Sequence, residues 1–366
     1  MKFVDLRTQY MRQRMEIDRG MAAVLEHGQF IMGPEIGQLE TALAAFVGVR
    51  HAISVANGTA SLEIALRALE IGPGDEVITV PFTWISSAEA IGLVGAKPVF
   101  VDVEPETFNL DPELLAVAMT PRTRAIIPVS LFGQMADYER IGITAARYGV
   151  PVIEDGAQSF GATRHGRKSC SVTIIGSTSF FPSKPLGCYG DGGALFTDDD
   201  ALAERMRAIR THGGTARHHH QYIGTNGRLD TLQAAVLLSK LACFQDEVEL
   251  RRHIGARLSE ELGESCVTPT IAPGNTHVYG QYTIRIRARD VVASALKKMG
   301  IPTAVYYPKC LHEQPVFEPL GYKWGSFPEA ERASREVLSL PLHPYLTKEE
   351  QDLVVRGVRE TVLAIQ

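Results

Sequence analysis

Cysteine is scarce and scattered in this sequence. Its 366 residues include only five cysteines, and none of them forms a C-x-x-C pair. An odd, dispersed set argues against a disulfide framework and against the usual zinc-binding spacings. We therefore expect reduced thiols, as in a cytoplasmic protein, at positions Cys170, Cys188, Cys243, Cys266 and Cys310.

Long apolar runs are also missing. No stretch approaches the ~18 uninterrupted apolar residues of a membrane span. The opening residues, MKFVDLRTQYMRQ, lack the apolar core and small-residue cleavage site of a secretory signal. We expect a cytoplasmic protein with no membrane insertion.

Positive charge is not in excess. Lysine and arginine number 37 against 42 acidic residues, so the formal net charge is -5. Without a global basic surplus, nucleic acid is excluded as the main partner. A local basic pocket for a small anionic ligand is compatible with this balance.

What is present is a strand–helix alternation typical of an α/β fold. Seven short, mostly apolar runs read as strands buried on both faces of a mostly parallel sheet. With helical patterns between them, they predict a doubly wound domain. A chain of this length favours two domains, and we place them at 1–245 (large) and 246–366 (a smaller C-terminal α/β domain), joined by a long helix beginning near Asp230. The expected strands are 51–57, 76–80, 97–103, 124–129, 150–155, 172–180 and 193–197.

The first candidate site is the turn Asn57-Gly58-Thr59 between a strand and a helix expected at 61–70. Free backbone N–H groups and the positive end of a helix dipole would suit a phosphate there. The alternative is simple helix capping by Thr59 or Ser61. Gly72 is expected as the C-terminal cap of this helix.

Lys184 is the second candidate, within SFFPSKPLGCYGDGGAL. It follows an apolar strand and two phenylalanines, and the glycines after it let the chain bend closely past a ligand. Burial should lower the pKa of its amine, and a neutral amine can attack an aldehyde to form an imine. The alternative is an ordinary loop lysine that reaches water.

The third candidate is the strand end Glu154-Asp155, in VPVIEDGAQSFGA. Ligand sites gather at the carboxyl ends of such strands. A carboxylate there could pair with a protonated pyridine nitrogen, and Gln158 could contact a ring hydroxyl or the substrate. The alternative is helix N-capping by Asp155.

Trp84 follows another strand and could stack on a flat heteroaromatic ring, although a lone tryptophan is more often a core residue. Together, a phosphate turn, a stacking aromatic, a strand-end aspartate and an imine-forming lysine predict a pyridoxal 5'-phosphate site on one sheet edge.

Three other functions are weighed against this hypothesis. A nicotinamide-dependent oxidoreductase is disfavoured because GPGDEV lacks the third glycine of GxGxxG and precedes a strand. A non-catalytic ligand sensor is disfavoured by Lys184 together with Asp155. A metal hydrolase using the histidines is disfavoured because no carboxylates lie at ligand spacing, so we expect no metal site. These histidines are His212, His218, His219 and His220.

The sequence resembles the sugar aminotransferases of the DegT/DnrJ/EryC/StrS group, fold-type I pyridoxal-phosphate enzymes. The resemblance covers nearly the whole chain and is most specific in the segment around Lys184. The dehydratases of the group replace this lysine with histidine, so Lys184 favours transamination. The matching segments are GQFIMGPEI, ANGTASL, GPGDEVITVPFTW, GAKPVFVDVEPETFNLDP, VIEDGAQSFGA, SFFPSKPLGCYGDGGA, NGRLDTLQAAVL and SLPLHPYL.

The resemblance implies a role for each matching residue. Lys184 would carry the cofactor as a Schiff base, Asp155 would pair with its ring nitrogen, and Gln158 would contact its ring hydroxyl. The full cofactor-binding set would be Gly58, Thr59, Ala60, Trp84, Asp155, Gln158, Ser179, Lys184 and Asn226.

The resemblance also implies a homodimer with shared sites, in which Asn226 reaches the phosphate of the neighbouring subunit. Arg228 is the candidate for a sugar carboxylate or diphosphate, with Tyr306 and Tyr307 as further substrate contacts. The sequence departs from the group at Gly156, where alanine is usual, and at Tyr306 and Cys310, where relatives often carry histidine and proline.

For the reaction, the resemblance implies L-glutamate as amino donor and a UDP-linked keto sugar as acceptor. Within the group, the implied acceptor is UDP-2-acetamido-2-deoxy-3-oxo-glucuronate, a precursor for lipopolysaccharide and O-antigen sugars. Amination at carbon 4 of a nucleotide sugar is the alternative, because such enzymes share the same cofactor motifs.

Overall fold

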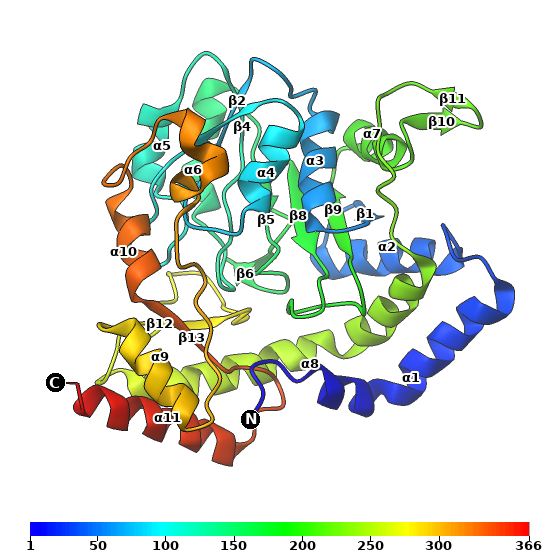
Figure 1. Cartoon of the computed structure of the whole chain (residues 1–366). Helices are drawn as coiled ribbons and strands as arrows, with labels where there is room; N and C mark the ends of the chain where they lie inside the picture. The colour runs from blue at the N-terminus through cyan, green and yellow to red at the C-terminus, as the bar shows by residue number, and fades with distance from the viewer. Residues whose placement is uncertain (366) are drawn as a thin grey trace.

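A seven-stranded sheet forms the centre of the molecule in a computed structural model that describes residues 1–365 (Figure 1). Parallel bridges at Ile126–Val152 and Val129–Asp155 join its two ladders. All neighbouring strands are parallel except around β9, which is antiparallel to both neighbours. The expected mostly parallel sheet is therefore confirmed. Its order is β1 (His51–Val55), β9 (Gly193–Thr197), β8 (Ile175–Ser179), β5 (Ile153–Asp155), β4 (Thr123–Ile126), β2 (Glu76–Thr79) and β3 (Lys97–Phe100).

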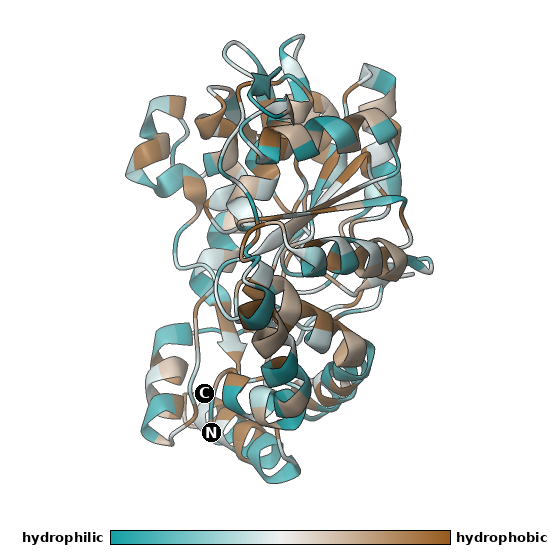
Figure 2. Cartoon of the chain, turned by 90° about the vertical axis from the view of Figure 1, so that its right-hand side faces the viewer, coloured by the Kyte–Doolittle hydropathy of each residue, from teal (hydrophilic) through white to brown (hydrophobic). Residues whose placement is uncertain are grey.

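Helices cover both faces of this sheet. Side chains alternate along a strand, so on β9 Leu195 enters one core while Ala194 and Phe196 enter the other. Figure 2 shows the hydrophobic residues gathered on these central strands. The Leu195 side carries α3 (Gly58–Ala68), α4 (Ser86–Leu93) and α7 (Asp200–Arg210); the opposite side carries α2 (Pro34–Val47), α5 (Pro112–Ala118), α6 (Tyr138–Tyr148) and part of α8 (Thr231–Leu262).

A third core lies at the C-terminal end of the chain. Strands β12 (Tyr282–Arg285) and β13 (Val337–Leu340) form an antiparallel pair that packs with helices and the end of α8. The expected boundary at residue 245 falls inside α8, whose Val248 still packs in the large core and whose Ile254 packs in the third. The two-domain division stays a prediction, and Gln366 lies outside the described residues. The helices of this core are α9 (Arg289–Lys298) and α11 (Lys348–Leu363), whereas η1 (Leu311–Glu313), η2 (Pro315–Leu320) and α10 (Pro328–Glu336) pack against the large core.

The first helix of the chain and the hairpin at 214–220 lie at the edge of the molecule (Figure 1). Helix α1 (Leu6–His27) runs along α8, where Gln9 and Gln13 donate to Glu247 at 2.8 and 3.1 Å. No helix within residues 1–365 is both long and apolar enough to cross a membrane. Two small hairpins complete the fold: β6 (Thr163–Arg164) with β7 (Arg167–Lys168), and β10 (Gly214–Ala216) with β11 (His219–His220).

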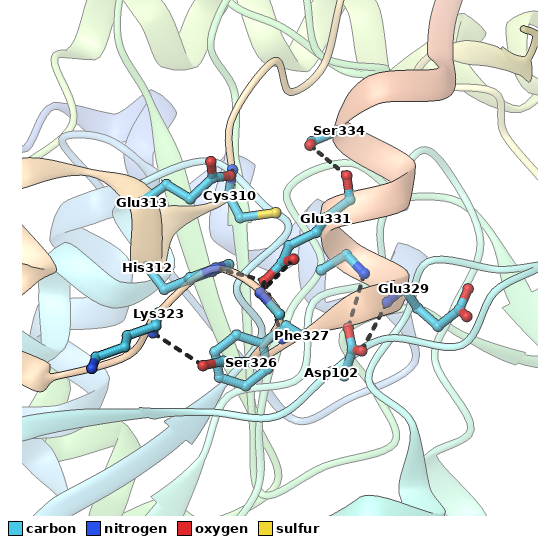
Figure 3. Close-up of polar contacts among 12 residues, drawn as sticks. Asp102, Cys310, His312, Glu313, Lys323, Ser326, Phe327, Glu329, Glu331 and Ser334 are labelled. Atoms are coloured by element: carbon cyan, nitrogen blue, oxygen red, sulfur yellow. Dashed lines mark hydrogen bonds and ion pairs between the residues drawn. The ribbon is translucent and has the colours of Figure 1, made fainter.

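The segment after Tyr307 is fastened to the large sheet by a polar network (Figure 3). Helix α10 has no side-chain cap of its own; instead Asp102, which follows β3, accepts hydrogen bonds from the backbone N–H groups of Glu329 and Ala330 at 3.0 and 2.9 Å. A carboxylate at a helix N-terminus satisfies free donors and complements the helix dipole. Asp102 therefore joins the C-terminal region to the sheet.

A buried carboxylate organises the same segment internally. Glu331 accepts hydrogen bonds from the backbone N–H groups of Gly325 and Phe327, and it pairs with His312 Nε2 at 3.1 Å (Figure 3). The backbone N–H of Leu311 donates to the Pro81 carbonyl, near the end of β2, at 2.7 Å. These bonds hold the chain that follows Tyr306 and Tyr307 against the sheet edge.

Candidate active site

A cavity of about 710 Å³ opens at the carboxyl ends of the parallel strands, within the usual size range of small-molecule sites. Residues from β5, β8 and the start of α3 meet there. The cavity brings together every predicted site residue except Arg228: Gly58, Thr59, Ala60, Trp84, Asp155, Gln158, Ser179, Lys184, Asn226, Tyr306 and Tyr307.

The N-terminus of α3 forms one end of the cavity. The helix begins at Gly58 rather than 61, because Asn57 is the N-cap: its side chain accepts from the Ala60 N–H at 2.8 Å. The alternative of simple capping by Thr59 or Ser61 is therefore wrong. The Thr59 hydroxyl instead pairs with Ser86 at 2.7 Å beside the cavity.

At the other end of α3, Leu69 rather than Gly72 is the C-cap. The N–H of Leu69 already bonds to the Ala65 carbonyl, so the helix closes before the glycine and the prediction at Gly72 was wrong.

Ser179, at the end of β8, faces the same helix terminus. A Cβ atom added to Gly58 would lie 2.8 Å from the Ser179 Cβ, so only glycine allows this approach. Backbone N–H groups at the start of a helix, with serine and threonine hydroxyls beside them, bind phosphate well. The residues present thus fit a phosphate group at this end of the cavity.

Asp155 ends β5 and is buried. Its Oδ2 accepts from the Ser87 hydroxyl at 2.8 Å and its Oδ1 from the Ala157 N–H at 3.2 Å. No helix follows, so the interpretation as a helix N-cap was wrong. Burial raises the pKa of Asp155, while the two hydrogen bonds and Lys184 oppose this. A buried carboxylate is stabilised by a nearby cation, as a protonated pyridine nitrogen would provide.

Lys184 lies in the turn after β8, where its backbone N–H bonds to the Phe181 carbonyl at 2.8 Å. Lys184 lines the cavity, and within residues 1–365 its amine donates no hydrogen bond to a protein group. Burial lowers the pKa of Lys184, and the charge of Asp155 raises it in part. The alternative of a lysine in open solvent is therefore wrong, and the amine can supply the neutral form needed for imine chemistry.

Aromatic residues form the wall across from the strand ends. Trp84 is 58% exposed at the cavity, so it is not a core tryptophan. Its ring centroid lies 6.3 Å from that of Tyr307. The Tyr307 hydroxyl accepts from Gln158 Nε2 at 3.1 Å, and Gln158 Oε1 accepts from the Phe132 N–H at 2.9 Å. These contacts fix Gln158 and Tyr307 in the cavity, and Tyr306 lines it beside them.

The loop at 225–228 only partly matches its predicted role. Asn226 lines the cavity of its own chain, so its predicted reach to a neighbouring subunit stays a prediction. Arg228 is partly buried and does not line the cavity, and its Nε has no hydrogen-bond partner among residues 1–365. The Gly227 N–H donates to the Arg210 carbonyl at 3.0 Å, and the Gly227 carbonyl accepts from the Ala56 N–H at 2.8 Å. These two bonds fix the backbone immediately before Arg228.

The departure from the family pattern at Gly156 has a structural reason. A Cβ at this position would lie 2.6 Å from Cys170 Sγ and 2.8 Å from Ser169 Oγ. Both neighbours also surround Glu154, whose carboxylate accepts from the Ser169 hydroxyl and the Cys170 N–H. Glycine after Asp155 therefore makes room for the packing of Cys170.

Sequence reasoning missed several residues of the cavity. Ser86 and Ser87 follow Trp84 closely, and their hydroxyl groups near a strand end were the available signal. Gln281 comes from the C-terminal region and has no local signal. The histidines His218, His219 and His220 are exposed on the β10–β11 hairpin, and within residues 1–365 no three His, Cys, Asp or Glu residues are grouped to hold a metal ion.

Comparison with known proteins agrees with this geometry. The model of the DegT/DnrJ/EryC1/StrS aminotransferase family matches residues 12–359. A Pseudomonas aeruginosa UDP-2-acetamido-2-deoxy-3-oxo-D-glucuronate aminotransferase is 52% identical over 346 residues, 94% of this chain and 96% of that protein. The enzyme DesV of S. venezuelae, solved with a ketimine intermediate, is 39% identical with a TM-score of 0.97, covering 99% of this chain and 98% of its own.

The cofactor assignment has the same support. The structure of ntda from Bacillus subtilis, solved with bound cofactor pmp, is 31% identical with a TM-score of 0.90 over 96% of this chain and 82% of its own. An oxidoreductase function is thereby overturned. The chain is a fold-type I, pyridoxal-phosphate-dependent aminotransferase and belongs to the DegT/DnrJ/EryC1/StrS aminotransferase family.

Proposed function

We propose that this enzyme transfers the amino group of L-glutamate to carbon 3 of UDP-2-acetamido-2-deoxy-3-oxo-glucuronate, giving a UDP-3-amino sugar and 2-oxoglutarate. The observation that carries the proposal is the 52% identity to the P. aeruginosa enzyme over nearly the full length of both chains. That enzyme is named for a 3-oxo sugar, so carbon 4 is not the favoured position. The product suits lipopolysaccharide and O-antigen synthesis in the cytoplasm.

We assign the cofactor-facing roles from the cavity. Gly58, Thr59, Ala60 and Ser179 would hold the phosphate, and Trp84 would lie against the ring. Bound pyridoxal phosphate supplies an aldehyde that takes up amines and a ring that withdraws electrons from the reacting carbon.

The catalytic roles fall to Lys184 and Asp155. In the glutamate half-reaction Lys184 Nζ, with its lowered pKa, would accept the proton from the Cα of glutamate and pass it to the former aldehyde carbon of the cofactor; in the sugar half-reaction it would move a proton the opposite way, to carbon 3 of the sugar. The Asp155 carboxylate, which hydrogen bonds from Ser87 and Ala157 help to keep charged, would stabilise a positive charge on the ring nitrogen. Gln158 positions Tyr307 beside them.

We further propose a homodimer with shared sites. Arg228 lies outside the cavity of its own chain and carries a buried, unpaired Nε. Its guanidinium would serve a neighbouring subunit, binding the sugar carboxylate or the diphosphate. Asn226 would contact the cofactor phosphate in the same assembly.

The test uses purified protein, ¹⁵N-labelled glutamate and a panel of UDP- and dTDP-linked 3-keto and 4-keto sugars. We expect labelled amine at carbon 3 of the UDP-linked uronate, detected by NMR. Lys184→Ala should lose at least about 1,000-fold in rate while keeping its circular dichroism spectrum. Label at carbon 4, or in no sugar, would overturn the substrate assignment.

A further inference from the structure

Gln281 lies on the cavity wall, and its side chain has no assigned cofactor contact and no hydrogen bond to the fold within the described residues. Gln281 immediately precedes β12 and lines the cavity together with Tyr306 and Tyr307. Its Oε1 is buried and has no hydrogen-bond partner in the part of the chain that the structure describes. Its Nε2 is not among the buried atoms and also donates to no protein group within residues 1–365.

The backbone of Gln281 is fixed relative to the reacting centre. Its N–H donates to the Phe132 carbonyl at 3.1 Å, and the Phe132 N–H in turn donates to Gln158 Oε1 at 2.9 Å. A Cβ added to Gly280 would lie 2.6 Å from the Gln158 carbonyl oxygen, so the two segments touch. Gln281 is thus held against the same strand-end residues that surround Asp155.

Two glutamines near the cavity are fully paired, whereas Gln9 and Gln13 in α1 keep a buried Oε1 without a partner among the described residues, as Gln281 does. Gln134 donates to the Thr270 carbonyl at 2.7 Å and accepts from the Ala272 N–H at 3.0 Å. Gln158 uses both ends of its amide on Phe132 and Tyr307. Gln281 differs from these residues in its Nε2, an accessible and unpaired donor on a residue of the cavity wall, from which a bound molecule can accept a hydrogen bond.

The chemistry of a carboxamide suggests which partner. It carries no charge, and it offers one acceptor beside two donors. Glutamate presents carboxylates, which cationic groups bind more strongly. The acetamido group at carbon 2 of the proposed sugar is itself an amide, with one N–H and one carbonyl oxygen, and it neighbours the reacting carbon 3.

We propose that Gln281 is a specificity-determining residue that binds the 2-acetamido group of the keto sugar, its Nε2 donating to the acetamido oxygen. This inference rests on the proposed function. It concerns only the second half-reaction, because glutamate lacks such a group.

The experiment compares wild type with Gln281→Leu, which keeps the bulk of the side chain but removes its polar ends. Both are given UDP-3-oxo-glucuronic acids that carry either an acetamido group or a hydroxyl at carbon 2. We expect kcat/KM for the acetamido sugar to fall about 10- to 100-fold, largely through KM, and that for the hydroxyl sugar to change less than about 3-fold. The glutamate half-reaction, followed by the loss of yellow absorption, should be unchanged.

Gln281→Glu serves as the second variant, because it keeps the shape and an acceptor but loses both donors. It should show the same selective loss. Equal losses on both sugars, a slowed glutamate half-reaction, or no loss at all would overturn the role of Gln281. A wild-type enzyme that aminates neither sugar would overturn the proposed function and this inference with it, whereas an active wild type with an unaffected Gln281→Leu would overturn this inference alone.

Discussion

The Ser87 hydroxyl donates a 2.8 Å hydrogen bond to Oδ2 of Asp155, joining α4 to the end of β5 at the floor of the cavity. This bond opposes the effect of burial, which raises the pKa of Asp155. Serine therefore helps to keep the carboxylate charged and fixes its direction.

Asp155→Asn should reduce the overall transamination rate at least about 100-fold, because a buried positive charge on the cofactor ring would lose its partner. Ser87→Ala removes only the orienting bond and should cost about 10-fold or less. Steady-state rates of both variants, measured together with their cofactor content, test whether Asp155→Asn loses more activity than Ser87→Ala. A Ser87→Ala variant as impaired as Asp155→Asn would contradict it.

Gly58→Ala should weaken cofactor binding about 10- to 100-fold, since its Cβ would press on Ser179 and widen the phosphate cradle. Gly37→Ala is the matched control: no atom lies within 4 Å of its added Cβ in α2, so cofactor affinity should be unchanged. Fluorescence titration of the apoenzyme with pyridoxal phosphate measures both. Equal affinities of Gly58→Ala and Gly37→Ala for pyridoxal phosphate would show that Gly58 does not border the phosphate site.

Glu154 makes stability depend on pH. Burial raises its pKa from 4.5 to about 7, so between these values the folded state retains a proton that the unfolded state releases. Stability should therefore fall as pH rises through this window, by at most about 3 kcal/mol. Urea unfolding at pH 5 and pH 8 measures the fall, and Glu154→Gln should lose less over the same interval. If Glu154→Gln lost as much unfolding free energy between pH 5 and pH 8 as wild type, Glu154 would not be the group responsible for the pH dependence.

Asp102→Ala should destabilise the protein by about 1–2 kcal/mol, because it leaves the N-terminus of α10 uncapped. Hydrogen exchange should increase across residues 310–334. Asp199→Ala removes the cap of α7, where Asp199 accepts from the Leu202 N–H at 2.9 Å, and should leave exchange in that segment unchanged. Faster exchange across residues 310–334 in both variants would show that the effect does not depend on the hydrogen bonds between Asp102 and α10.

The sheet and the polar ends of its strands were predictable because both are local. Continuous apolar runs predicted the seven strands. Asp155 ends one of these runs and Lys184 follows another, and ligands bind at such strand ends in α/β sheets. Even there, the start of α3 was misplaced, because Asn57, Thr59 and Ser61 are all good caps and only the packed structure selects Asn57.

The rest of the site depends on contacts between distant segments. Gln281 reaches the cavity through its backbone bond to Phe132, and no pattern near residue 281 announces it. Arg228 is a different case: the family resemblance makes it a candidate for the sugar carboxylate or diphosphate, and the backbone bonds that fix Gly227 leave it outside the cavity of its own chain. Side-chain position in such loops is set by tertiary packing rather than by local sequence.

The most direct test of the account is to find which amine holds the cofactor. The purified enzyme, loaded with pyridoxal phosphate, is reduced with borohydride, digested and analysed by mass spectrometry. We expect the pyridoxyl group on Lys184 alone, and its absence after prior treatment with glutamate. A modified lysine elsewhere, or an unmodified Lys184 in a yellow enzyme, would contradict the central claim.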